Sequence, residues 1–291
     1  MFGRDGASGG RANTGQFVTV AGVRLHYVRA GAGVPVVLLH GNAGFTQDYA
    51  ALLQALPAQG YQAIAFDRPG HGLSERPTKE PATVEAQVGL LHAALRQLEI
   101  ERPVLVAHSW SGALALCYAL EYETELAALV LLAPAVYSDE ADFAAESALV
   151  ALPGLSDLLI KLSGPIIGRK IKSSLLEAFA PDPVPADYLQ LAQAVWIRPS
   201  QIKAIVEDDN SFNATVQALS PRYSEVRIPT IIMTGDSDRL VAPEVHAYPL
   251  HRTLTQARLI VLPETGHMLP HTRPAAVLEA IQAVCAPGRA R

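Results

Sequence analysis

Ser109, Asp238 and His267 belong to three residue types that can act together in nucleophilic catalysis, and each follows an apolar run typical of a buried strand. A serine hydroxyl is a weak nucleophile at neutral pH and needs a base to accept its proton. An imidazole can be that base, while a carboxylate fixes the imidazole tautomer and stabilises the imidazolium as it forms. This chemistry requires a fold that brings together side chains that are far apart in the sequence.

The stretch around Ser109 has the pattern of a strand, a tight turn and a helix. The run 104–107 is apolar, and an alanine-rich helical stretch follows Gly112. At such a turn the serine backbone is strained, and the residues two positions away must be small, as Ala107 and Ser111 are. The turn approximates the usual pattern G-x-S-x-G, in which the serine is a nucleophile. The alternative interpretation is that Ser109 only caps the next helix.

The elements that must position these residues alternate between strand patterns and helix patterns. The strand-like segments, of which the first two predict a hairpin, are 17–20, 23–28, 35–39, 61–66, 103–106, 129–132, 229–234 and 257–262. Helical spacing predicts a helix over 45–56 that Pro57 stops, a second over 84–98 and a third from Pro274 to 284. This alternation predicts an α/β fold with a parallel sheet covered by helices on both faces. The three candidate residues would meet where the carboxyl ends of the strands lie.

Residues 138–225 interrupt this alternation. They contain helix-like segments with proline and glycine breaks and no convincing strand, and the strand pattern resumes afterwards. We therefore predict a core formed by 17–137 and 226–291, with 138–225 as a helical cap inserted in it. Residues 1–16, rich in glycine, alanine and serine, are predicted to be a disordered lead-in.

Composition excludes several classes of protein. The chain has 291 residues, of which 49% are hydrophobic and 18% charged, so overall disorder is not expected. The net charge is −5 and no basic stripe is present, which disfavours a nucleic-acid partner. The run 103–120 is uncharged, but its first half has a strand pattern and polar residues lie in its middle, so we expect no integral membrane association.

Two features bear on the compartment. The N-terminal stretch lacks the apolar segment of a signal peptide. Cys117 and Cys285 have no metal or redox spacing, and two thiols in a chain of this length favour a reducing compartment. Both features predict a cytoplasmic protein.

From about residue 17 to 284 the sequence resembles the α/β-hydrolase superfamily. The matching motifs, in the order of that family, are His40-Gly41, the segment 67–74, the turn around Ser109, the segment 235–238 and Gly266-His267. The resemblance implies an eight-stranded, mostly parallel sheet flanked by helices, with a helical cap over the site. It also implies that Ser109 is the nucleophile, His267 the base and Asp238 the orienting acid.

Each of these roles has a competitor. Asp236 competes with Asp238, but the family spacing favours Asp238. Ser111 also lies in the turn, at the position of the small residue, and His271 lacks a preceding glycine. We expect the remaining polar residues near these motifs to pack or to brace loops; they are His40, Asp67, Arg68, His71, Ser74 and His108.

An acyl-transfer site also needs hydrogen-bond donors for the developing oxyanion. The turn supplies the backbone N–H of Trp110, and the resemblance implies that Asn42 supplies a second one. Asn42 and Trp110 also resemble the pair that holds halide in haloalkane dehalogenases. Those enzymes have an aspartate nucleophile, and a serine that attacked an alkyl halide would leave a stable ether, so dehalogenation and epoxide hydrolysis are disfavoured. The two side chains are then expected to line the acyl pocket.

The beginning of the predicted cap is strongly apolar, and part of it is expected to bind substrate. Leu149, Leu152 and Trp196 are the candidates for this pocket. Two alternatives stay open: an ordinary core of the cap, or a surface that touches lipid, although Asp157 and Lys161 interrupt the run.

Together these features predict a serine hydrolase without cofactor or metal that cleaves small to medium apolar carboxylic esters through an acyl-enzyme. The expected partner is a small-molecule ester, and the chain is expected to be a monomer or a homodimer. The same three residues could instead serve C–C bond hydrolysis, lactone or amide hydrolysis, perhydrolysis or acyl transfer. A ligand receptor without catalysis is disfavoured because the set of three is complete.

Overall fold

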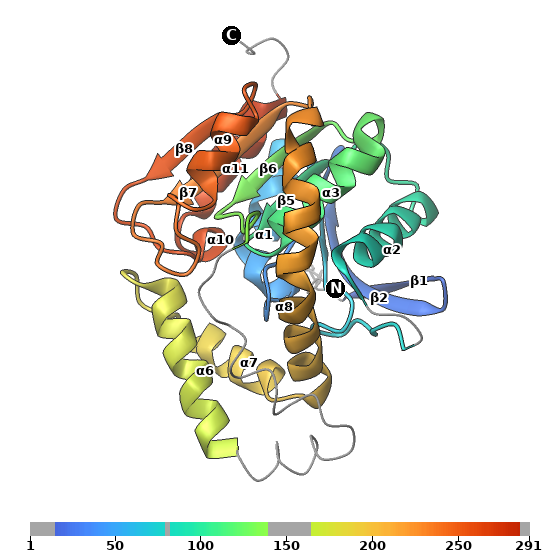
Figure 1. Cartoon of the computed structure of the whole chain (residues 1–291). Helices are drawn as coiled ribbons and strands as arrows, with labels where there is room; N and C mark the ends of the chain where they lie inside the picture. The colour runs from blue at the N-terminus through green and yellow to red at the C-terminus, as the bar shows by residue number, and fades with distance from the viewer. Residues whose placement is uncertain (1–14, 79–81, 139–163, 286–291) are drawn as a thin grey trace, which may run out of the picture.

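The computed structural model describes residues 15–78, 82–138 and 164–285 (Figure 1). Its centre is an eight-stranded sheet with the order β1-β2-β4-β3-β5-β6-β7-β8. The strands are β1 (Gln16–Val20), β2 (Val23–Gly31), β3 (Val34–Leu39), β4 (Tyr61–Phe66), β5 (Val104–His108), β6 (Ala128–Leu132), β7 (Thr230–Gly235) and β8 (Arg258–Leu262). The predicted eight-stranded sheet is confirmed.

The sheet is antiparallel at one edge and parallel elsewhere. β1 pairs with β2, and β2 with β4, in antiparallel fashion, whereas every pair from β4 through β3 to β8 is parallel. The expected hairpin turns through Ala21 and Gly22, whose φ angles of 48° and 78° suit a tight hairpin. Because β3 and β5 to β8 run in one direction, the residues that follow them emerge at one edge of the sheet.

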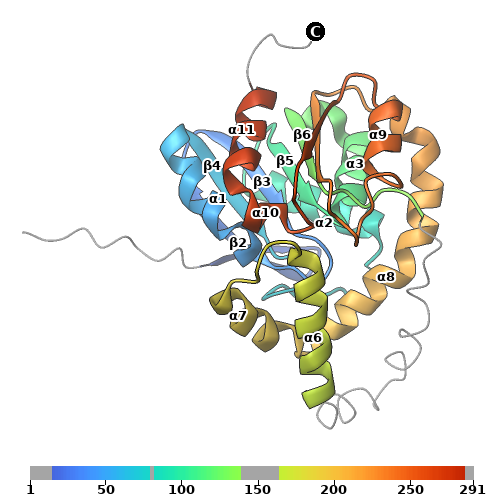
Figure 2. The same ribbon diagram turned by 90° about the vertical axis from the view of Figure 1, so that its left-hand side faces the viewer.

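Helices cover both faces, as Figure 2 shows. On one face lie α1 (Ala50–Ala55), α10 (Leu269–Thr272) and α11 (Pro274–Cys285); on the other lie α2 (Val84–Gln97), α3 (Ser111–Tyr122) and α9 (Ala247–Thr253). Side chains of β3 alternate between the two faces, so that Val36 and Leu38 join one buried cluster while Val37 and Leu39 join the other. Both clusters fix the strand ends on which the candidate site depends.

The undivided helix predicted over 45–56 and the end of the lead-in predicted at residue 16 are wrong. The single helix expected over 45–56 is divided into η1 (Thr46–Tyr49), α1 and η2 (Leu56–Gln59), and Pro57 lies inside η2. Proline is tolerated in a first helical turn, so the chain reverses only at Gly60, where φ is 80°. Gln16 belongs to β1 and not to the lead-in, because it pairs with Tyr27 and its side chain accepts a hydrogen bond from the Tyr27 hydroxyl.

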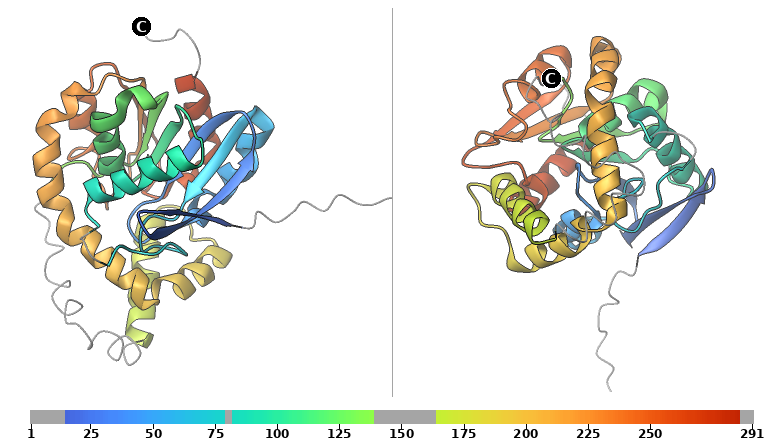
Figure 3. Two further views of the ribbon diagram at one scale, coloured as in Figure 1. Left: turned by 90° about the vertical axis from the view of Figure 1, so that its right-hand side faces the viewer. Right: turned by 60° about the horizontal axis from the view of Figure 1, so that its bottom comes forward.

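Between β6 and β7 the described residues contain helices and connecting loops but no strand. The helices are α6 (Gly164–Phe179), α7 (Ala186–Trp196), α8 (Pro199–Leu219) and η4 (Ser220–Glu225). Figures 1 and 3 show α6 and α7 beyond the strand ends, with α8 extending from them along the side of the core. The predicted cap is helical where it is described, and its boundaries stay a prediction. Within the three described ranges, no helix is both long and apolar enough to cross a bilayer.

Candidate active site

The turn that carries Ser109 joins β5 to α3 with a strained backbone. Ser109 has a φ of 55°, in the left-handed region that a non-glycine residue rarely adopts. Its N–H donates to the carbonyl of Leu132 (2.9 Å), and its carbonyl accepts from the N–H groups of Gly112 (2.8 Å) and Ala135 (3.0 Å). These three hydrogen bonds hold the strained residue, as a turn that projects one hydroxyl requires.

The alternatives at this turn do not fit the geometry. The residue at the N-cap of α3 is Trp110, and no side chain caps the helix, so Ser109 is not a helix cap. The Ser111 hydroxyl donates to the carbonyl of His40 (2.5 Å) and braces the neighbouring loop. Gly41 lies so close that a Cβ there would come within 3.4 Å of Ser109 Oγ. The loop after β3 therefore lies directly beside the Ser109 side chain.

Asp238 and His267 form a buried hydrogen-bonded pair. His267 Nδ1 lies 2.7 Å from Asp238 Oδ2, while Asp238 Oδ1 accepts from the N–H groups of Leu240 (3.0 Å) and Val241 (2.9 Å). Burial by itself would raise the pKa of Asp238, but His267 and the two N–H groups outweigh it and lower that pKa. Asp238 is therefore an anion that orients His267, whereas Asp236 is exposed to solvent.

His108 connects the Ser109 turn with the His267 loop. Its Nε2 lies 2.9 Å from the carbonyl oxygen of His267, and the two imidazole rings are 4.7 Å apart. Burial, together with the nearby His267, lowers the pKa of His108 to about 3. A neutral imidazole that donates to a carbonyl positions the loop and does not act as a base.

The last contact of the predicted triad is not formed. Ser109 Oγ and His267, both among the described residues, make no hydrogen bond to each other. Such contacts are often long before substrate binds. The structure thus joins Asp238 to His267. Ser109 directly follows His108, whose ring packs against the His267 ring. The three catalytic roles stay predictions.

The side chains of Asn42 and Trp110 both face α8. Asn42 Nδ2 donates to Asp209 Oδ1 (2.5 Å) and lies 3.4 Å from the carbonyl of Ile205. Trp110 is 3% exposed, and its Nε1 lies 3.4 Å from the carbonyl of Asp208. Their side-chain donors therefore meet acceptors of the protein itself.

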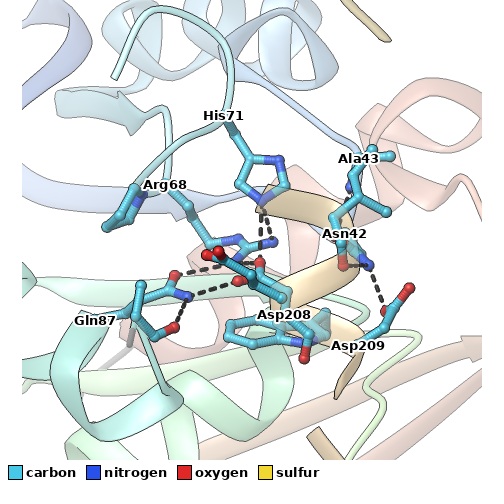
Figure 4. Close-up of polar contacts among 12 residues, drawn as sticks. Asn42, Ala43, Arg68, His71, Gln87, Asp208 and Asp209 are labelled. Atoms are coloured by element: carbon cyan, nitrogen blue, oxygen red, sulfur yellow. Dashed lines mark hydrogen bonds and ion pairs between the residues drawn. The ribbon is translucent and has the colours of Figure 1, made fainter. Parts of the chain in front are cut away.

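A buried ion-pair network surrounds these contacts (Figure 4). Asp208 accepts hydrogen bonds from Arg68 (2.6 Å), His71 (3.0 Å), Arg76 (2.9 Å) and Gln87 (3.0 Å). Burial would raise the pKa of Asp208, but Arg68, His71 and Arg76 outweigh it and hold that pKa well below its usual range. Every oxygen of this carboxylate is engaged, which is how a protein retains a fully buried charge.

The sequence interpretation missed Asp208 and Asp209. A usable signal existed, because Gln201, Ile205, Asp208 and Phe212 recur at helical spacing and so share one face of α8. An acidic residue on the face of a helix that packs against the core requires a buried partner. Nothing in the sequence identifies that partner as Arg68.

The predicted substrate-binding residues of the cap are only partly described. Leu149 and Leu152 lie outside the described residues. Trp196, at the end of α7, packs against an apolar cluster that includes Phe45, Phe179 and Tyr188. In the parts of the chain that the structure describes, no group of three or more histidine, cysteine or acidic side chains could hold a metal ion.

A sequence model described as the alpha/beta hydrolase fold matches residues 34–274. The chain belongs to this family. Its motifs, its sheet and the position of Ser109 after β5 agree with that membership.

Two relatives and one solved structure are similar to this chain. A 2-hydroxy-6-oxononadienedioate/2-hydroxy-6-oxononatrienedioate hydrolase of Comamonas testosteroni is 28% identical over 275 residues, which cover 88% of this chain and 91% of that protein. A 2-hydroxy-6-oxo-6-phenylhexa-2,4-dienoate hydrolase of the same species is 28% identical over 254 residues, or 84% of each chain. The crystal structure of Cfl2 from Burkholderia cenocepacia superposes with a TM-score of 0.78 at 21% identity and covers 94% of this chain and 95% of its own, which shows a shared fold.

Proposed function

We propose that this protein is a serine hydrolase that cleaves carboxylic esters of small to medium apolar substrates. The observation that carries the proposal is the buried Asp238–His267 pair, which lies beside the strained turn that projects Ser109. A carboxylate with a lowered pKa, bonded to one ring nitrogen, leaves the other nitrogen of the imidazole as a proton acceptor.

The reaction follows from these positions. His267 accepts the proton of Ser109 Oγ as the oxygen attacks the ester carbonyl. The backbone N–H groups of Asn42 and Trp110 stabilise the oxyanion, and His267 returns the proton to the leaving alcohol. Water, activated by His267, then hydrolyses the acyl-enzyme. This route needs no cofactor.

Hydrolysis of a C–C bond is the second candidate, and the two relatives named above favour it. Their names state hydrolysis of 2-hydroxy-6-oxo dienoates, which carry carboxylate groups. Near the proposed oxyanion loop, however, this chain carries Asp209, and the Arg68 guanidinium that contacts the Gly41 carbonyl (3.2 Å) is already paired with Asp208. The Asp209 carboxyl beside this loop favours an uncharged ester over a dienoate that carries carboxylate groups.

Dehalogenation finds no support in the site. The Asn42 and Trp110 donors that would hold a halide are bonded to α8, and the nucleophile position is a serine. A serine ether could not be hydrolysed to complete a turnover.

The test combines activity with covalent labelling. Ser109→Ala should lower the kcat for a series of p-nitrophenyl esters by at least about 10⁴-fold and abolish labelling by a fluorophosphonate, since the nucleophile is lost. The exposed Ser200→Ala is the matched control and should behave as the wild type. Near-normal turnover by the Ser109 variant would refute the proposal. A 2-hydroxy-6-oxo dienoate, assayed in parallel, decides between the two bond types.

A further inference from the structure

One face of helix α8 contacts both residues whose backbone N–H groups are proposed to bind the oxyanion. Ile205 precedes Asp208 and Asp209 by three and four residues, and Phe212 follows them by four and three, so Asp208 and Asp209 flank the side of the helix that carries Ile205 and Phe212. α8 belongs to the insertion after β6, whereas the proposed donors lie in the loop after β3 and in the turn after β5. The helix thus connects two separate parts of the core at the place where the oxyanion would form.

Asn42 is held at both ends of its side-chain amide. Nδ2 donates to Asp209 Oδ1 and to the carbonyl of Ile205, and Oδ1 accepts from the N–H of Ala43 (3.0 Å). One turn before Ile205 on α8, Gln201 Nε2 donates to the carbonyl of Ala43 (3.2 Å). These contacts hold the loop at Asn42, which follows the Gly41 that lies beside the Ser109 side chain.

Trp110 is held between charged and aromatic groups. The Arg68 guanidinium carbon lies 4.1 Å from the centre of the indole, and Arg68 is bonded in turn to Asp208. The Phe212 ring lies 6.0 Å from the indole, whose Nε1 points to the Asp208 carbonyl. The indole therefore has little freedom to tilt, and neither has the peptide that would contribute the second donor.

The position of Asp209 lowers the stability of the folded protein when its carboxyl is ionised. Burial, with Asp208 next to it, raises the pKa of Asp209 to about 7, although the Asn42 amide and Arg68 act in the opposite direction. An asparagine or serine could accept the same hydrogen bond without this cost. A carboxylate that lowers stability and contacts an oxyanion-loop residue points to a role in activity.

We propose that Asp209, together with the neighbouring Asp208 carbonyl on α8, positions the two proposed oxyanion donors. Asp209 is thus a positioning residue, and the effect passes through the side chains of Asn42 and Trp110. The inference rests on the proposed function. A displacement of about 1 Å in such a donor can lower the rate by about 100-fold.

The experiment compares Asp209→Ala, which removes the acceptor, with Asp209→Asn, which retains an oxygen at the same place. The exposed neighbour Asn210→Ala is the control. Active sites are counted with a fluorophosphonate, and kcat and KM are measured on one p-nitrophenyl ester. The inhibition constant of a trifluoromethyl ketone is also measured, because Ser109 Oγ adds to its carbonyl carbon, His267 takes the proton, and the carbonyl oxygen becomes an anion in the hole.

We expect Asp209→Ala to lower kcat per active site by about 10–100-fold, with KM within about threefold, and to weaken the ketone by a similar factor. Asp209→Asn should recover most of both. A purely structural role would reduce the number of active sites and leave the inhibition constant of the remainder unchanged, which would overturn the inference.

The experiment allows for three further outcomes. If Asp209→Ala does not fold, Asn42→Ala replaces it, because it removes the other half of the contact and should give the same paired losses. If the wild type neither turns over an ester nor takes the label, the proposed function fails and this inference with it. If the wild type does both and Asp209→Ala matches Asn210→Ala, the inference alone fails.

Discussion

Among the buried aspartate–histidine pairs of the described residues, those of Asp238 and Asp208 have similar chemistry and different surroundings. His267 lies 2.7 Å from Asp238, and His71 lies 3.0 Å from Asp208. His71 is closed on both sides, since its Nδ1 meets Gln201 (2.9 Å) and burial, together with Arg68, lowers its pKa to about 4. His267 Nε2, by contrast, takes no hydrogen bond from the described residues.

The comparison shows that the pair alone does not define a catalytic site. The Asp208 carboxylate is occupied by four side chains and holds α8 against the loop after β4. The Asp238 carboxylate is held by two backbone N–H groups and leaves one oxygen for the histidine. A buried aspartate can therefore anchor a helix or orient a base, and the number of competing donors decides which.

The largest effect should come from Asp238→Asn. The amide cannot hold His267 in the required tautomer, so kcat should fall by about 10⁴-fold, while the free energy of unfolding changes by about 1–2 kcal/mol at most. Ester turnover and thermal unfolding measure the two quantities. Asp236→Asn, at the exposed position two residues earlier, is the control. Equal losses of activity in the two variants would remove the distinction between them.

Asp208→Leu should have the opposite effect, with its main loss in the free energy of unfolding. It leaves the buried Arg68 guanidinium without its counter-charge, and breaking such a pair typically lowers the free energy of unfolding by about 3–5 kcal/mol. The midpoint of urea unfolding should fall accordingly with an unchanged slope. Glu207 precedes Asp208 on α8 and is a partly exposed partner of Arg76, so Glu207→Gln should lower the same quantity by less than about 1 kcal/mol. A small loss from Asp208→Leu would show that the network is not a structural anchor.

The smallest effect concerns the dependence of stability on pH. The pKa of Asp209 is about 7 in the folded protein and near 3.8 in an unfolded chain, so folding favours its protonated form. The folded state therefore loses stability as the pH rises from about 4 to about 7, and the full penalty is present above about pH 7. Asp209→Asn removes this titration and should stabilise the protein by about 2 kcal/mol at pH 8, allowing for the partial exposure of the carboxyl.

Thermal unfolding at pH 4 and at pH 8 tests the sign. The gain from Asp209→Asn should be present at pH 8 and vanish near pH 4, whereas Asn210→Ala should show no such difference. A gain that is independent of pH would mean that folding does not shift the pKa of Asp209.

Much of the fold could be predicted because hydrophobic period is a local property. The run 61–66 is apolar except for Gln62, and it forms β4 with those bounds. The short helices α9 and α10 were not predicted, because Ala247–Thr253 and Leu269–Thr272 are too short for a helical period to emerge. The expected helix over 45–56 failed for a related reason, since apolar spacing does not distinguish an α-helical turn from a 3₁₀ turn.

The candidate site likewise has a part that the sequence predicts and a part that it does not. Ser109, Asp238 and His267 could be selected because each follows a strand, and parallel strands end at one edge of the sheet. The contacts of Asn42 and Trp110 with α8 could not be selected, because they join residues about 100 to 170 positions apart whose approach no local pattern encodes.

The sequence by itself determined which segments are strands and helices, the order of the family motifs and the three residues proposed to act on substrate, because all of these depend on residue type and short spacing. Only the tertiary structure decided that Asp208 binds Arg68 and that Asp209 binds Asn42. It also decided that both ring nitrogens of His71 are bonded, whereas His267 Nε2 takes no hydrogen bond from the described part of the chain. The physical reason is that a buried polar group takes its character from the partners that packing brings to it, and the packing of α8 against two distant loops is a property of the whole folded chain.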